Sequence, residues 1–110
     1  MTLKELTQKI ELEIINEYDF NISITKPFSC DLLSVCMSKA SSGCVWVTVM
    51  GNVNAVAVAT LTDCACIILA EGANLDDNAL NSAKTKNVNV LRSTKPIFET
   101  ALEVHNAISI

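Results

Sequence analysis

Apolar and polar positions alternate along the chain in a way that predicts short strands and helices following one another. The pattern is clearest in the second half. There an apolar run at 64–70 precedes a Glu71-Gly72 turn, a polar helix over 73–86 and a strand at 88–91. A strand, a crossover helix and a second parallel strand make a βαβ unit. Because the run at 64–70 is apolar on both faces, we expect it at the centre of a sheet that helices cover on both sides.

The chain opens with a pattern typical of a short capped helix. Thr2 stands at an N-cap position with Glu5 three residues later, which is the spacing of a capping box. The apolar residues of this helix recur at helical spacing and are Leu3, Leu6 and Ile10. Two strands rich in β-type residues are predicted next, at 12–15 and 22–25.

Pro27 is expected to end regular pairing after the second strand. A helix over 31–40 follows, capped by Ser29 or Asp31. Its predicted core face consists of Leu32, Leu33, Val35, Cys36 and Met37. The segment 44–49, Cys-Val-Trp-Val-Thr-Val, is the strongest strand prediction in the chain.

The apolar run at 53–61 has two interpretations. It alternates Val and Ala, and with 50–52 as a turn it would form a hairpin with the strand before it. Alternatively, Asn52 or Asn54 caps a helix whose small apolar residues pack against a sheet and which ends at 62–63. Local pattern leaves both open, because a continuous apolar run lacks the periodicity that separates them.

A last helix is predicted to open at Pro96, since proline suits the first turn. Its predicted inward face consists of Ile97, Phe98, Ala101, Leu102 and Val104. Strands and helices therefore alternate at the end of the chain, and the fold class is α/β. With 110 residues, 50% of them hydrophobic, we expect a single domain over 1–110.

Composition narrows the classes of partner. The formal net charge is -4 and no cluster of Lys and Arg could follow a phosphate backbone, so no nucleic-acid partner is expected. No apolar run reaches the roughly 20 residues of a membrane helix, and no signal segment opens the chain, so we expect a cytoplasmic protein without a membrane partner. The apolar content slightly exceeds what a small monomer buries, which predicts a homodimer.

The five cysteines do not form a metal-binding pattern. Their number is odd, no two are spaced as C-x-x-C, and the only histidine, His105, lies in the last helix. We therefore expect no metal or other cofactor, and we expect buried thiols. Cys64 and Cys66 are expected on one face of a strand. Cys30, ahead of a helix N-terminus, is the thiol whose pKa a helix dipole could lower.

Several segments, in their order and spacing, resemble the DRTGG domain family over residues 3–104. They are 31–34, 45–48, 54–59, 67–72, 90–93 and 98–101. That family is similar to the N-terminal domain of HPr kinase/phosphorylase and also occurs between CBS domains of some regulatory pyrophosphatases. The resemblance implies a three-layer α/β/α sandwich with a mixed, largely parallel sheet of about five strands. It also favours a helix over 54–61.

What the resemblance implies for function is a regulatory or ligand-sensing module. The name-giving Asp-Arg-Thr-Gly-Gly stretch is not present, and Glu71-Gly72 stands at the nearest equivalent position. The chain also lacks the Gly-rich phosphate loop that ends in Gly-Lys-Ser/Thr, so kinase activity is not expected. His105 is interpreted as a surface residue near a helix C-terminus, and we expect no catalytic residues.

The candidate ligand site lies where parallel strands end, because helix N-termini there present free N–H groups that favour anions. The predicted ligand-binding residues are Asp31, Thr48, Asn52, Asn54, Glu71, Gly72, Ser93 and Thr94. Two of them are carboxylates, which indicates instead a cation-assisted or hydroxyl-rich ligand. The leading hypothesis is a non-catalytic module that binds a small anionic metabolite or nucleotide.

Two further hypotheses remain open at this point. One is a protein-interaction module that regulates a partner kinase or a redox enzyme complex. The other is a metal-dependent hydrolase that uses Asp31 and Glu71, which requires both carboxylates to converge on one ion.

Overall fold

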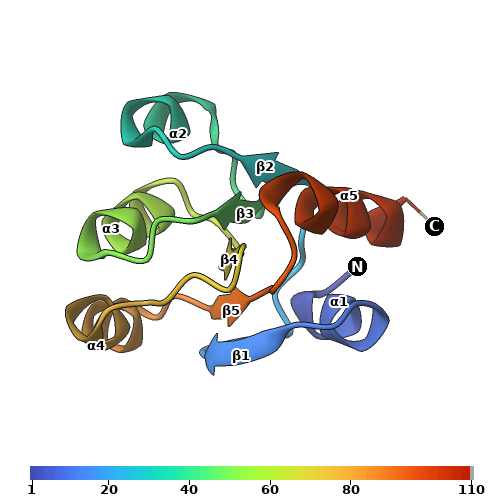
Figure 1. Ribbon diagram of the computed structural model, residues 1–110, viewed down its shortest axis with the longest axis horizontal. Coiled ribbons are helices and arrows are strands. Elements are labelled where there is room, and N and C mark those ends of the chain that lie inside the picture. Colours follow the sequence, from blue (N-terminus) through green and yellow to red (C-terminus); the bar gives the residue numbers. More distant parts are fainter. Residues whose placement is uncertain (110) are drawn as a thin grey trace.

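A five-stranded sheet lies between two layers of helices in the computed structural model, which describes residues 1–109 (Figure 1). The strand order is β1-β5-β4-β3-β2. β2 to β5 run parallel, and β1 pairs antiparallel with β5. The strands are β1 (Glu13–Asn16), β2 (Pro27–Ser29), β3 (Val45–Thr48), β4 (Cys66–Leu69) and β5 (Val90–Arg92). The predicted three-layer α/β/α fold is confirmed.

The helices divide unequally between the two faces of the sheet (Figure 1). One face carries α2 (Leu33–Lys39), α3 (Val53–Leu61) and α4 (Asp77–Lys86). The other face carries α1 (Leu3–Lys9) and α5 (Ile97–Ile108). Within residues 1–109, no helix is both long and apolar enough to cross a lipid bilayer.

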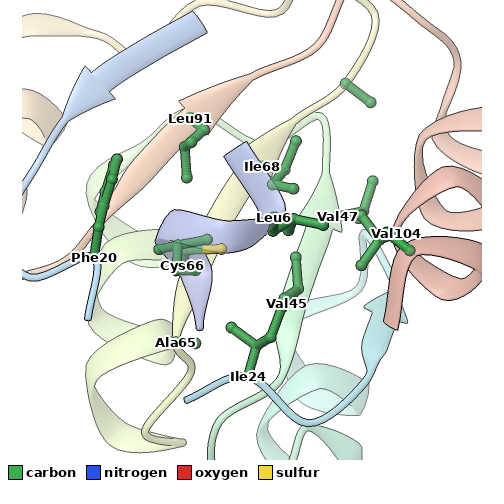
Figure 2. Close-up of a cluster of buried hydrophobic side chains, with 13 residues drawn as sticks. Leu6, Phe20, Ile24, Val45, Val47, Ala65, Cys66, Ile68, Leu91 and Val104 are labelled. Carbon is green, nitrogen blue, oxygen red and sulfur yellow. The ribbon is translucent and has the colours of Figure 1, made fainter. Parts of the chain in front are cut away.

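Each face of the sheet has its own hydrophobic core. Figure 2 shows the core beneath α1 and α5, where Leu6 and Val104 meet Val45 and Ile68 of the central strands. The opposite core, beneath α2 to α4, is built around Trp46. β3 and β4 serve both cores because successive side chains of a strand point to opposite faces.

The ambiguous run at 53–61 is the helix α3. The Oδ1 atom of Asn52 accepts a hydrogen bond from the N–H of Ala55 at 2.9 Å, which caps the helix. The hairpin interpretation is wrong because β3 and β4 pair in parallel. A parallel pair needs a crossover connection, and α3 supplies it.

The predicted strand at 22–25 is wrong. Ser23 makes only an isolated bridge to Thr2, and Ile24 is buried in the core beneath α1. The second strand is instead β2, and it begins at Pro27, which was expected to stop pairing. Proline is tolerated there because β2 is an edge strand and Pro27 is its first residue.

The predicted N-cap of α2 is also wrong. The helix begins at Leu33, its N-cap is Leu32, and no side chain caps it. Of the five apolar residues assigned to its core face only Cys36 is buried, whereas Leu32 is 60% exposed and Met37 45%. The reason is that α2 packs at the end of the helical layer beside α3, so one narrow stripe of its surface is covered.

The inward face of α5 agrees with the prediction at Val104, which is buried, and at Ile97 and Ala101, which pack against the core, and it differs at Phe98 and Leu102. Phe98 is 70% exposed and Leu102 is 42% exposed, whereas Thr100, Val104 and Ala107 are buried. The polar Thr100 turns inward because its hydroxyl reaches the buried Ser93 side chain. A sequence pattern weighted by hydrophobicity alone misses such a contact.

Candidate functional site

The carboxyl ends of β2 to β5 meet at one edge of the sheet, and all eight predicted ligand-binding residues lie along it, Thr48 as the last residue of β3 and the others in loops and helix starts. They do not form one cluster. Asp31 and Thr48 lie together at the β2–β3 end. Glu71, Gly72, Ser93 and Thr94 lie at the β4–β5 end. The edge is therefore best described as two neighbouring groups.

Asp31 and Thr48 are held together by hydrogen bonds. The Thr48 hydroxyl, which is fully buried, donates to Oδ1 of Asp31 at 2.6 Å. The same oxygen accepts the N–H of Val49 at 3.0 Å. Asp31 thus fixes the end of β3 instead of capping α2, and it is an exposed residue of the edge.

The two asparagines have different roles. Asn52 is half-buried and its side chain caps α3, so its oxygen is already engaged. Asn54 lies exposed in the first turn of α3. The structure thus supports a structural role for Asn52.

Glu71 and Gly72 form a tight turn against the end of β5. Both have positive φ angles, 59° and 65°. Their N–H groups donate to the carbonyl oxygens of Lys95 at 2.9 Å and Ser93 at 2.8 Å. Glycine suits position 72 because this left-handed conformation costs other residues energy. The turn locks the loops after β4 and β5 together.

Ser93 is buried in the centre of this second group. Its Oγ accepts hydrogen bonds from the Thr100 hydroxyl at 3.0 Å and from the Lys95 N–H at 3.1 Å. Thr94 beside it is exposed. Ser93 therefore shapes the loop, and Thr94 is the side chain left free to meet a ligand.

A polar cavity of about 150 Å³ opens at the end of β5. Its lining consists of Glu11, Glu13, Arg92, Ser93, Thr94 and Lys95. A larger depression of about 400 Å³ lies between the ends of α1 and α5, around Lys9 and Ala107. We regard the smaller one as the candidate site because two cations and two of the predicted residues converge there.

Arg92 is oriented from two sides. One of its terminal nitrogens donates to Glu13 at 2.6 Å and the other to Asn74 at 2.9 Å. Its guanidinium retains further N–H donors. Arg92, Lys95 and the two glutamates were missed at the sequence level. Arg92 directly precedes the predicted Ser93, and only the antiparallel pairing of β1 brings Glu13 to it.

The two groups are joined through Gly51. Its carbonyl oxygen accepts the N–H of Asp76 at 2.9 Å, and its Cα packs on the backbone of Asn74. A Cβ at position 51 would stand 1.9 Å from the Asn74 oxygen. The contact leaves no room for any other residue and places the loop after β3 against the loop after β4.

Gly51→Ala is expected to lower the free energy of unfolding by about 3 kcal/mol, because a backbone carbonyl cannot move aside as a flexible side chain could. The control is Gly72→Ala, whose Cβ would meet nothing within 4 Å. That variant should cost only about 1 kcal/mol from its left-handed backbone. Urea unfolding measures both. Equal destabilisation of the two variants would contradict the steric argument.

The thiols differ from expectation in two respects. The lowered thiol pKa belongs to Cys44, at about 7, chiefly through its hydrogen bond with Cys64. Cys64 precedes β4 and packs in the core around Trp46, whereas Cys66 lies in the opposite core, so the two do not share a face. Burial raises the pKa of Cys36 to about 12.

Among residues 1–109, no three His, Cys, Asp or Glu side chains are grouped so as to hold a metal ion.

No protein-family model matches the chain, and no curated protein matches it in sequence. A solved structure of the CBS and DRTGG domains of the regulatory region of Clostridium perfringens pyrophosphatase, complexed with activator, diadenosine tetraphosphate, contains a part with the same fold. The TM-score is 0.78 with 13% sequence identity over 96% of this chain. The chain spans 46% of that protein's chain, under half its length. At this identity the likeness defines the fold class alone.

Proposed function

We propose that the chain is a single DRTGG-like domain over 1–110 that acts as a non-catalytic, ligand-sensing regulatory module. The ligand is a small anionic metabolite or nucleotide, bound at the carboxyl edge of the sheet. The observation that carries this proposal is the polar cavity at the end of β5, where Arg92 and Lys95 flank Ser93 and Thr94.

The chemistry of the cavity fits a phosphorylated ligand that also carries hydroxyl groups. Arg92 has N–H donors beyond the two that Glu13 and Asn74 use, and charge-assisted bonds to phosphate are strong. Glu11 and Glu13 offer oxygens that accept hydrogen bonds from hydroxyls. Phosphate and ribose together present both kinds of group, which supports a nucleotide. The structurally similar pyrophosphatase region binds a nucleotide activator.

The test is thermal stability against nucleotides, phosphorylated metabolites and divalent metals. A ligand that binds only the native state stabilises by about 2.7 kcal/mol at a hundredfold excess over its Kd. We expect a nucleotide to raise the Tm of the wild type and to leave the Tm of the Arg92→Gln variant unchanged. Lys84→Gln, on the last turn of α4 and away from the cavity, is the matched control and should respond like wild type. An equal Tm shift in the Arg92→Gln variant would mean that the nucleotide binds elsewhere on the protein.

A second candidate function is a protein-interaction module that regulates a partner kinase or a redox enzyme complex. It is favoured by the exposed apolar side chains of α5 and the loop before α2, where Phe98 is 70% and Leu32 60% exposed. If none of the compounds changes the Tm, this second candidate function is favoured. Homodimerisation belongs to the same proposal, and light scattering that gives a monomer at micromolar concentration would refute it.

A further inference from the structure

Two cysteine sulfurs lie together at the sheet edge opposite the candidate ligand site. The Sγ atoms of Cys44 and Cys64 are 3.3 Å apart. Cys44 directly precedes β3, and Cys64 lies two residues before β4, in the loop that leaves α3. We propose that this pair is a reversible redox modification site, which forms a disulfide through exchange with a low-molecular-weight disulfide such as oxidised glutathione. The proposal does not depend on the ligand site.

The backbone around the pair is held in place by the sheet. The N–H of Gly43 donates to the carbonyl oxygen of Asp63 at 2.8 Å, and the N–H of Ala65 donates to that of Cys44 at 2.9 Å. The Ser42 hydroxyl also donates to the Asp63 carboxylate at 2.6 Å. These bonds lie on both sides of the two cysteines. Closing the sulfurs to the S–S bond length of about 2.05 Å therefore needs a small adjustment of side chains.

The two sulfurs differ in exposure, which sets the order of reaction. Cys44 is fully buried, whereas Cys64 is only half-buried and also contacts the Thr62 hydroxyl at 3.1 Å. An external disulfide can therefore reach Cys64 first. Cys44 lies behind it, in position to attack the sulfur of Cys64.

The protonation of the pair determines which thiol ionises first. The hydrogen bond with Cys64 lowers the pKa of Cys44 to about 7 and raises that of Cys64. Once the pair has lost one proton, the remaining proton lies between two sulfurs 3.3 Å apart. Transfer of this proton onto Cys44 leaves the more exposed Cys64 as the attacking thiolate. After the first exchange, Cys44 loses this proton and is the second nucleophile.

The exchange balances in two steps. The Cys64 thiolate attacks one sulfur of the small disulfide, whose S–S bond breaks, and the small thiolate that leaves takes up the first proton that the pair released. Cys44 then loses its proton, and its thiolate attacks the sulfur of Cys64, which forms the intramolecular bond and expels the second small thiolate to take up that proton. The two protein thiols together lose two electrons and two protons, and the small disulfide gains them as two thiols.

The experiment treats the reduced, native protein with oxidised glutathione and maps its peptides under non-reducing conditions. We expect the free thiols to fall by two from the five present, with Cys44 linked to Cys64. The Tm should rise by roughly 10 °C, since the cross-link closes a loop with a sequence separation of 20. Dithiothreitol should reverse both changes.

Two variants test the order of attack. Cys44→Ser should stop at a mixed disulfide of glutathione on Cys64, whereas Cys64→Ser should leave Cys44 unmodified. Cys30→Ser is the matched control, since Cys30 and Cys36 form the other close cysteine pair, with the Cys36 thiol donating to the Cys30 carbonyl oxygen. This control should cross-link like wild type. The proposal would be overturned by a disulfide between Cys30 and Cys36 in the wild type, or by a Cys44–Cys64 disulfide that forms only in urea. The peptide map of the wild type decides this even where a variant misfolds.

Discussion

Trp46→Ala is expected to destabilise the protein by about 4 kcal/mol, the largest loss of stability that we predict for a single substitution. Trp46 is fully buried in the core beneath α2 to α4, and its removal leaves a cavity that the rigid central strands cannot close. Its Nε1–H also donates to the carbonyl oxygen of Cys30 at 3.0 Å. Urea unfolding followed by circular dichroism measures the loss, since the variant has no tryptophan fluorescence.

Trp46→Phe separates packing from hydrogen bonding. It keeps an aromatic ring but leaves the Cys30 carbonyl with only the weak donor of the Cys36 thiol, so we expect a loss of about 1 kcal/mol beyond the change in volume. Phe98→Ala, an exposed aromatic on α5, is the control and should change stability by less than about 0.5 kcal/mol. A Trp46→Ala variant no less stable than Phe98→Ala would contradict the assigned core.

Trp46 also connects the core with Asp31 and Thr48 at the β2–β3 end of the sheet edge. Cys30, whose carbonyl it binds, directly precedes Asp31, and Asp31 holds the end of β3 through Thr48. Loss of the Trp46 donor should therefore loosen Asp31. Faster amide hydrogen exchange at Val49, whose N–H donates to Asp31, measures this in Trp46→Phe.

Asn89→Leu is expected to cost about 3 kcal/mol, a loss that among our predictions only Trp46→Ala exceeds. The buried Asn89 side chain accepts the N–H groups of Tyr18 and Asp19 and donates to the carbonyl oxygens of Asp19 and Ala65. Leucine would leave all four backbone groups without these partners, and each unpaired buried group costs about 1–3 kcal/mol. The loop around Tyr18 is exposed, so water recovers part of this cost.

The control for Asn89 is Asn78→Leu, an exposed position in the first turn of α4. It should leave stability nearly unchanged. Urea unfolding followed through the fluorescence of the single, buried Trp46 compares the two variants. Similar midpoints for both would show that the Asn89 bonds do not hold the loop between β1 and β2.

The sheet edge that carries the candidate site could be placed from the sequence, because parallel strands bring their carboxyl ends to one edge of a sheet. The predicted residues do lie along that edge. The sequence predicted the structural roles of these residues less well: Asp31 is bound to Thr48, Asn52 caps α3, and Ser93 is buried against Thr100. The cations of the cavity were missed because Glu13, which orients Arg92, is distant in sequence.

Local signals determined the elements whose chemistry is local. The sequence by itself determined three features: the capping box of Thr2 and Glu5, the apolar strands β3 and β4, and the α/β alternation. They follow from the intrinsic helix and strand preferences of their residues and from contacts between residues close in sequence. Only the tertiary structure decided whether 53–61 is a helix, which faces of α2 and α5 are covered, and which two of the five thiols meet. Each of these depends on which segments the parallel sheet places side by side, and contacts between residues far apart in sequence leave no mark on the local pattern.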